Sequence, residues 1–210
     1  MIVPSLFNVS AIKSIFVITL VSLLVVSCSK SEVEMEPVVS NQALNIYAPA
    51  TTDYTVSPPS EAGNFTKFNF ETGSVVTNDN WDVAFRGTTI IVNGGVEVGL
   101  TDEPSRTGIG ALSLQTGAFS DILMAPEANE FTQDQAGALA LPKSTWYTYN
   151  RQTHIISAVA GKVLVIKTHN DHYVKMEILS YYKDLDTSQD PRYYSFNYVF
   201  NPNIGEKILE

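Results

Sequence analysis

The sequence has few of the residues on which several classes of protein depend. Cys28 is its only cysteine, so it has no intramolecular disulfide and no pair of thiols for redox chemistry. None of its three histidines belongs to a His-Glu-x-x-His metalloprotease motif, and it has no Gly-x-Ser-x-Gly elbow. Residues 108–110 read Gly-Ile-Gly but lack the third glycine of a dinucleotide-binding loop. We therefore expect a binding protein that is not an enzyme.

Basic residues are also scarce. The chain has 13 Lys and Arg against 22 Asp and Glu, which gives a formal net charge of −9. The long-range field of such a chain repels polyanions, so nucleic acid and anionic membrane surfaces are poor partners. Nothing in the sequence selects a catalytic pair among the many carboxylates. The length of 210 residues suits one folded domain, and no repeat of 20 to 50 residues is visible.

One long apolar run lies near the beginning of the sequence, at residues 14–27. It is too short for a membrane span but suits the apolar region of a signal peptide. It ends in VVSC, residues 25–28, which resembles the lipobox of bacterial lipoproteins. We predict that residues 1–27 are a lipoprotein signal peptide and that Cys28 receives the lipid. The alternative is an ordinary secretory signal with a chance cysteine.

The residues after Cys28 are polar and acidic. Residues 29–37, SKSEVEMEP, have neither a helical nor a strand period, so we predict a flexible tether at 28–44 before a β domain at 45–210. Acidic residues so close to the cysteine also resemble the surface-export signal of Bacteroidetes lipoproteins, although a merely solvated linker has the same composition. The expected location is the outer membrane, with a lipid anchor and the domain facing the cell exterior.

From about Asn45 the sequence consists of short runs rich in aromatic and β-branched residues, separated by turn residues. Strands are expected at residues 65–70, 89–92, 162–168, 172–182 and 193–200, and residues 169–171 are expected to close a hairpin. In the strand at 172–182, Met176 lies on the more apolar face and is predicted to be a core residue. The last strand places Tyr194, Phe196, Tyr198 and Phe200 on one face.

The middle of the chain, residues 99–143, is richer in Gly, Ala, Gln and Pro. Only residues 118–135 allow a helical turn or two. The predicted fold class is therefore all-β, with mainly antiparallel sheets, a long irregular middle segment and little helix.

Several segments together resemble the HmuY family, haem-binding lipoproteins of the Bacteroidetes cell surface. They are FNFETG (68–73), NWDVAFR (80–86), NGG (93–95), WYTYN (146–150), GKV (161–163), KMEILSYY (175–182) and YYSF (193–196). The resemblance implies an HmuY-like β fold, with haem as the bound cofactor. It also implies capture of haem at the cell surface and delivery to a TonB-dependent outer-membrane receptor.

Haem requires an apolar slot, one or two axial ligands to iron and donors for its propionates. The resemblance implies two axial ligands, which are His in some members and Met in others. His154 lies in the region of the family's C-terminal ligand and is the first candidate; the alternative is a loop histidine bonded to backbone. Met124, the only methionine of the middle segment, is the candidate second ligand, and the alternative is a core methionine.

Other residues are candidates for the remainder of a haem site. Trp146 and Tyr149 are expected to line the slot, together with Tyr147. Arg151 is the first candidate for a propionate, and Arg86 and Lys143 are further ones. Arg86 has an alternative partner in Asp82.

His169 and His172 flank the predicted hairpin turn. Two imidazoles on a mobile turn provide too few fixed ligands for a zinc site, so we expect a solvated turn.

Three functions remain open from the sequence. The first is haem capture and transfer by a surface lipoprotein. The second is a binding module of the same fold for a non-haem ligand or a partner protein. The third is a structural envelope protein, whose inward aromatic residues would be packed solid.

Overall fold

The computed structural model describes residues 34–57 and 59–210, and the predicted signal peptide and Cys28 lie outside this part of the chain. The strands are β1 (Val39–Tyr47), β2 (Thr51–Asp53), β3 (Ser60–Ala62), β4 (Thr66–Asn69), β5 (Ser74–Val76), β6 (Val83–Arg86), β7 (Thr89–Val92), β8 (Ala111–Thr116), β9 (Tyr147–Tyr149), β10 (Ile156–Ala158), β11 (Lys162–Lys167), β12 (Tyr173–Tyr182) and β13 (Pro191–Asn201). Three 3-10 helices of three residues each are η1 (Phe119–Asp121), η2 (Ala128–Glu130) and η3 (Lys183–Leu185). The predicted all-β class with little helix is confirmed.

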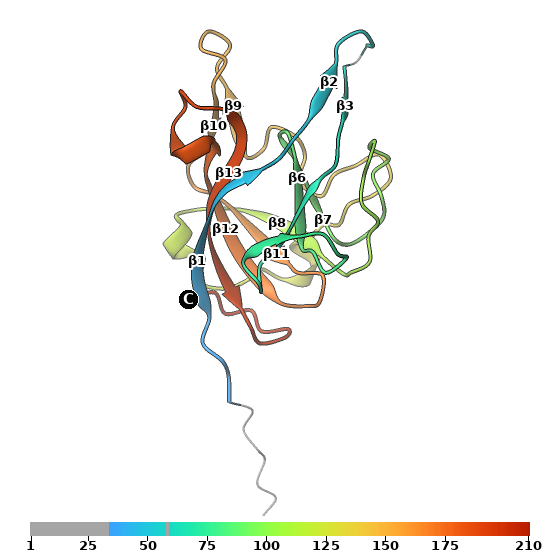
Figure 1. Cartoon of the computed structure of the whole chain (residues 1–210). Coiled ribbons are helices and arrows are strands. Elements are labelled where there is room, and N and C mark those ends of the chain that lie inside the picture. Colours follow the sequence, from blue (N-terminus) through green and yellow to red (C-terminus); the bar gives the residue numbers. More distant parts are fainter. Residues whose placement is uncertain (1–33, 58) are drawn as a thin grey trace, which may run out of the picture. The chain divides into compact units, whose positions relative to one another are not determined.

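Two larger sheets and two hairpins make up the domain (Figure 1). The five-stranded sheet has the order β1-β13-β12-β11-β8, and the four-stranded sheet has the order β5-β4-β6-β7. The pairs β2–β3 and β9–β10 form separate two-stranded hairpins. Every strand pairing is antiparallel, as predicted.

Aromatic side chains form the core between the two larger sheets. Along β13, alternate residues point to the same face, so the predicted row of Tyr194, Phe196, Tyr198 and Phe200 is buried together. The ring of Phe196 lies 5.2 Å from the ring of Phe68 on β4, edge to face, a geometry that the aromatic quadrupoles favour. Met176 is fully buried in this core, as predicted.

The outer faces of both sheets are also apolar, and irregular chain covers them. On the four-stranded sheet, Trp81 and Ile91 pack against Leu100 and Leu139 of the middle segment. On the five-stranded sheet, a second cluster consists of Ala125, Val165, Tyr173 and Leu209. These covers explain why β6 and β7 are buried at every position instead of alternating between apolar and polar residues.

A buried carboxylate holds the cover over the four-stranded sheet. Asp134 accepts backbone N–H bonds from Ala140 (2.8 Å) and Val92 (3.0 Å), and it pairs with Arg106 at 2.8 Å. Burial raises the pKa of Asp134, an effect that these donors oppose. Arg106 also pairs with Glu103, whose carboxylate accepts the N–H groups of the 98–100 loop. The irregular segment is therefore fixed by buried polar contacts.

The NGG segment after β7 is a point of close backbone approach. A Cβ atom on Gly94 would lie 2.0 Å from the carbonyl oxygen of Gly110, so no other residue fits there. The N–H of Gly110 donates to the carbonyl of Asn93 at 2.8 Å.

Two predicted boundaries are wrong. The tether was expected to reach residue 44, but β1 begins at Val39 and pairs with β13. Only Ala43 of β1 is buried, so this edge strand has no apolar alternation to reveal it. The middle segment was expected to be irregular throughout, but it contains β8, an edge strand on β11 with a polar end. The turns allowed at residues 118–135 are η1 and η2.

Among the described residues, no helix combines the length and the hydrophobicity needed to cross a membrane.

Replacing Phe196 by Ala is expected to lower the free energy of unfolding by about 3–5 kcal/mol, because it opens a cavity between the two sheets. Leu179→Ala on the neighbouring strand is the control, since Leu179 is 38% exposed and its loss should cost about 0.5 kcal/mol or less. Urea unfolding of both variants measures the difference, and equal losses would contradict the proposed core.

Candidate functional site

The β9–β10 hairpin projects from the sheets and carries most of the predicted site residues (Figure 1). Asn150 organises its loop: its N–H donates to the carbonyl of Ile155 at 2.8 Å, and its side-chain oxygen accepts the N–H groups of Gln152 and Thr153. His154 has a φ of 58°, in the left-handed region that histidine enters more readily than most residues. The loop therefore has a defined conformation.

A side-chain pair lies across this loop. The phenol oxygen of Tyr149 is 2.5 Å from Nδ1 of His154, and both residues are exposed, Tyr149 at 49%. In the tautomer whose Nδ1–H donates to the phenol oxygen, Nε2 keeps a free lone pair that can bind a metal. Metal-binding histidines are usually oriented in this way by a second group. His154 is therefore bonded to a side chain, whereas the alternative was a loop histidine bonded to the backbone.

Arg151 lies in the same loop and is exposed. It lines a hollow of about 420 Å³ together with Tyr149 and the neighbouring residues Thr148, Asn150 and Gln152. The structure therefore brings together three of the predicted residues, namely Tyr149, Arg151 and His154.

Trp146 does not line a slot. It is 2% exposed at the base of the hairpin, where its Nε1–H donates to the carbonyl of Thr88 at 3.2 Å. Its ring contacts those of Tyr147 and Tyr194, with centroids 4.8 and 5.3 Å away. The expectation of a wall residue is wrong for Trp146, because the residue just before β9 points into the core and supports the hairpin from below.

Met124 lies on another part of the molecule. It forms an isolated β-bridge with Ile208, beside bonds that join Ala125 to Lys207 and Leu209 to Leu123. It is 60% exposed, so it is not the core methionine that was the alternative. Figure 1 marks the nearby C-terminus well away from the β9–β10 hairpin. The two candidate ligands therefore do not share one slot.

Arg86 and Lys143 meet at a different cavity. Both line a cavity of about 360 Å³ at the β2–β3 hairpin. Lys143 pairs with Glu61 at 3.0 Å. The alternative partner Asp82 is not bonded to Arg86: the Asp82 carboxylate contacts Phe70 and His169 instead, and Arg86 donates to backbone carbonyls.

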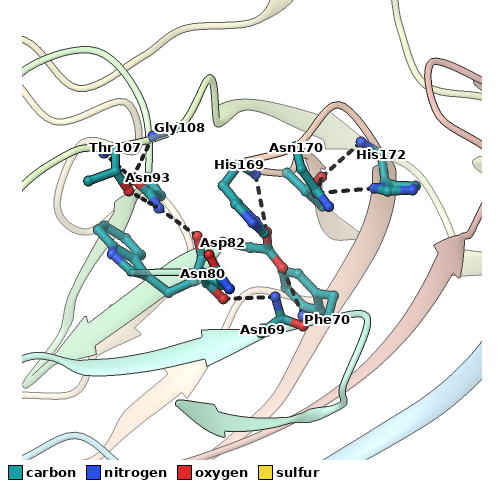
Figure 2. A network of polar contacts seen from close by, with 12 residues as sticks. Asn69, Phe70, Asn80, Asp82, Asn93, Thr107, Gly108, His169, Asn170 and His172 are labelled. Atoms are coloured by element: carbon teal, nitrogen blue, oxygen red, sulfur yellow. Dashed lines mark hydrogen bonds and ion pairs between the residues drawn. The ribbon is translucent and has the colours of Figure 1, made fainter. Parts of the chain in front are cut away.

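Asp82 is almost fully buried and joins the two larger sheets (Figure 2). It accepts the backbone N–H of Phe70 at 2.8 Å and that of His169 at 3.1 Å, and it also contacts Nδ1 of His169 at 2.6 Å. The sequence carries one signal of this role: Asp82 lies inside an apolar run, and a carboxylate buried there needs hydrogen-bond donors. The WD segment of the family resemblance thus has a structural role here.

The expected solvated turn at His169 and His172 is wrong. His169 is bonded to Asp82, and His172 is buried with its ring against Phe200 at 5.2 Å. The N–H of His172 donates to the hydroxyl of Thr168 at 2.8 Å. Asp82, the partner of His169, lies 87 residues away in the sequence, so no local sequence pattern predicts this contact.

Asn93 closes the same network (Figure 2). Its side-chain oxygen accepts the N–H groups of Thr107 and Gly108, and its amide donates to the carbonyls of Asp79 and Trp81. All its strong hydrogen-bonding capacity is used within the protein, so Asn93 fixes the loop after β7.

The chain is similar to one protein family and to several solved structures. The model of the HmuY protein family matches residues 61–198, more than half of the chain. The crystal structure of an apo HmuY analog from Tannerella forsythia is 13% identical, with a TM-score of 0.50 over 81% of this chain and 100% of that one. At this identity, the likeness shows a common fold.

Two further crystal structures are similar to a lesser degree. A candidate HmuY-like haem-binding protein from Bacteroides vulgatus is 15% identical, with a TM-score of 0.47 over 79% of this chain and 93% of that one. A candidate lipoprotein from Bacteroides fragilis is 14% identical, with a TM-score of 0.45 over 66% and 83%. None of the curated proteins matches the chain.

The contact between His169 and Asp82 predicts a pH-dependent stability. The hydrogen bond from Asp82 raises the pKa of His169 above its usual value, against the opposing effect of burial. The contact therefore stabilises the fold fully below the unfolded-state pKa of about 6.5, and this contribution is lost as pH rises through the higher folded-state pKa. Urea unfolding across this range should show a gap between the wild type and His169→Gln that narrows at high pH. A gap independent of pH would contradict this linkage.

Proposed function

The chain belongs to the HmuY family, and we propose on this premise that it captures haem at the cell surface and passes it to a TonB-dependent outer-membrane receptor. The observation that carries the proposal is the exposed Tyr149–His154 pair on the projecting hairpin. It offers an imidazole that is accessible and already oriented. The role is binding and transfer without catalysis.

The residues of this hairpin fit one face of a haem. Haem iron takes an imidazole as axial ligand, and His154 is the only exposed histidine of the described residues. Tyr149 holds the ring of His154 through Nδ1, and its exposed aromatic face is available to an apolar macrocycle. Arg151, in the same loop, supplies a guanidinium that matches a propionate. When bound, haem supplies a Lewis-acidic iron centre.

A second axial ligand from Met124 does not belong to this proposal, because Met124 lies beside the C-terminal segment. We infer that His154 is the ligand supplied by this chain. With one protein bond to the metal, fewer contacts have to break on transfer to a receptor.

The anchor completes the proposal. Lipid on Cys28 would hold the domain at the outer membrane through the residues that precede β1. The shortened tether ends at Val39, where the chain enters the five-stranded sheet.

Titration of purified protein with haemin is expected to give a saturable, shifted Soret band. His154→Ala should abolish or strongly shift this band, because it removes the axial donor, whereas Met124→Ala should leave it unchanged. Tyr149→Phe should weaken binding by freeing the imidazole. Circular dichroism of each variant controls for folding.

An unchanged spectrum of the wild type at micromolar protein would end the haem proposal. The family fold would then serve a non-haem ligand, to be identified by recovery from the native host.

The lipid anchor is tested by Cys28→Ala. In a bacterial host that processes lipoproteins, the wild type should take up labelled fatty acid and sediment with membranes, and the variant should do neither. Equal labelling of the two proteins would show that Cys28 is not the site of lipidation.

A further inference from the structure

A buried cation lies at the end of β6. Arg86 is 1% exposed, and no carboxylate of the described residues lies within ion-pairing distance of it. Its Nη1 donates to the backbone carbonyls of Gly63 (3.2 Å) and Thr101, and its Nε has no hydrogen-bond partner. The guanidinium carbon lies 4.3 Å from the centre of the Phe65 ring. A buried charge without a counter-ion is unfavourable, so this position favours a ligand of opposite charge.

Arg86 lines the cavity of about 360 Å³ introduced above. The other walls come from the β2–β3 hairpin, from residues 99–101 and from Lys143. The hydroxyl-bearing residues Thr52, Ser60 and Thr101 also line it. Lys143 is 47% exposed and pairs with Glu61, and an exposed pair of this kind contributes little stability, so its ammonium can exchange partners.

The surrounding charges favour a monoanion. Burial lowers the pKa of Arg86, and the carboxylates of Glu61, Asp102 and Glu103 oppose this effect. These acidic groups offset the buried charge from a distance. A monoanion bound beside Arg86 meets less repulsion from them than a dianion does.

We propose that the cavity at the β2–β3 hairpin is a carboxylate site, in which Arg86 and Lys143 bind one carboxylate group. A guanidinium and an ammonium are the side chains that bind carboxylates most strongly. The carboxylate has two possible sources, a small free acid or a propionate of haem held at the β9–β10 hairpin. The second source rests on the proposed function, and it is compatible with the fold because both hairpins project from the same end of the domain (Figure 1).

Thermal unfolding in sodium propionate tests the site, with sodium chloride at equal ionic strength as the reference. A ligand that binds only the folded state raises the Tm. We expect a saturable rise for the wild type and for Lys162→Ala, a control at a lysine bonded to Thr116 on the other sheet. Lys143→Ala should raise the dissociation constant for propionate about tenfold, because it removes one charge-assisted hydrogen bond. Arg86→Met should lose the rise.

Lys143→Ala keeps the test decisive if Arg86→Met does not fold, since Lys143 is on the surface. The absence of a propionate-specific rise in the wild type would overturn the proposal. A larger rise in phosphate than in propionate would overturn the assignment to a monoanion.

The source is tested with haemin and its dimethyl ester. If a haem propionate occupies the cavity, haemin binds more tightly than the ester to the wild type, and Lys143→Ala removes that difference. If a free acid is the ligand, propionate raises the Tm while haemin and the ester bind alike. A propionate effect in a protein that does not bind haemin would support the carboxylate site and contradict the proposed haem function.

Discussion

Both larger sheets are apolar on both faces, and most of the structure follows from that constraint. The inner faces meet in the aromatic core, so each outer face needs a cover of its own. The domain has almost no helix to provide it. Irregular chain from the middle segment and the C-terminus provides the covers instead. Such chain has backbone groups that need partners, and Asp134 within the cover and Asn93 at the end of β7 are buried where they accept its N–H groups.

The buried side chains that hold the fold together lie apart from the exposed side chains that offer a ligand site. Asp82, Asn93 and Trp146 are buried and hold the sheets, their covers and the hairpin base together. The exposed functional groups lie on the hairpins, which extend beyond the two sheets and do not cover either of them. Substitutions of Tyr149, Arg151 or His154 therefore leave the packing of the two sheets intact.

The sequence predicted those parts of the fold that depend on local patterns, such as alternating apolar residues and turn residues. The β11–β12 hairpin and the buried Met176 followed from alternation and a turn signal. The edge strand β1 did not, because its contribution is backbone pairing and only one of its side chains is buried.

The same reason explains how much of the candidate site could be predicted. Tyr149, Arg151 and His154 are close in sequence and are close in space. Contacts between distant segments determine where Met124 lies and which partners His169 and Arg86 have. Local sequence patterns do not predict such contacts.

The pairing of β1 with β13 bears on when the protein can fold. Val39 pairs with Phe200, so the first strand of the domain finds its place only against the last. The five-stranded sheet cannot be completed until the chain has been synthesised as far as β13. Contacts between such distant residues also slow folding, because a long loop must close before they form. Completion of the five-stranded sheet is therefore a late step in the folding of the domain, whereas the four-stranded sheet pairs only strands that are close in the sequence.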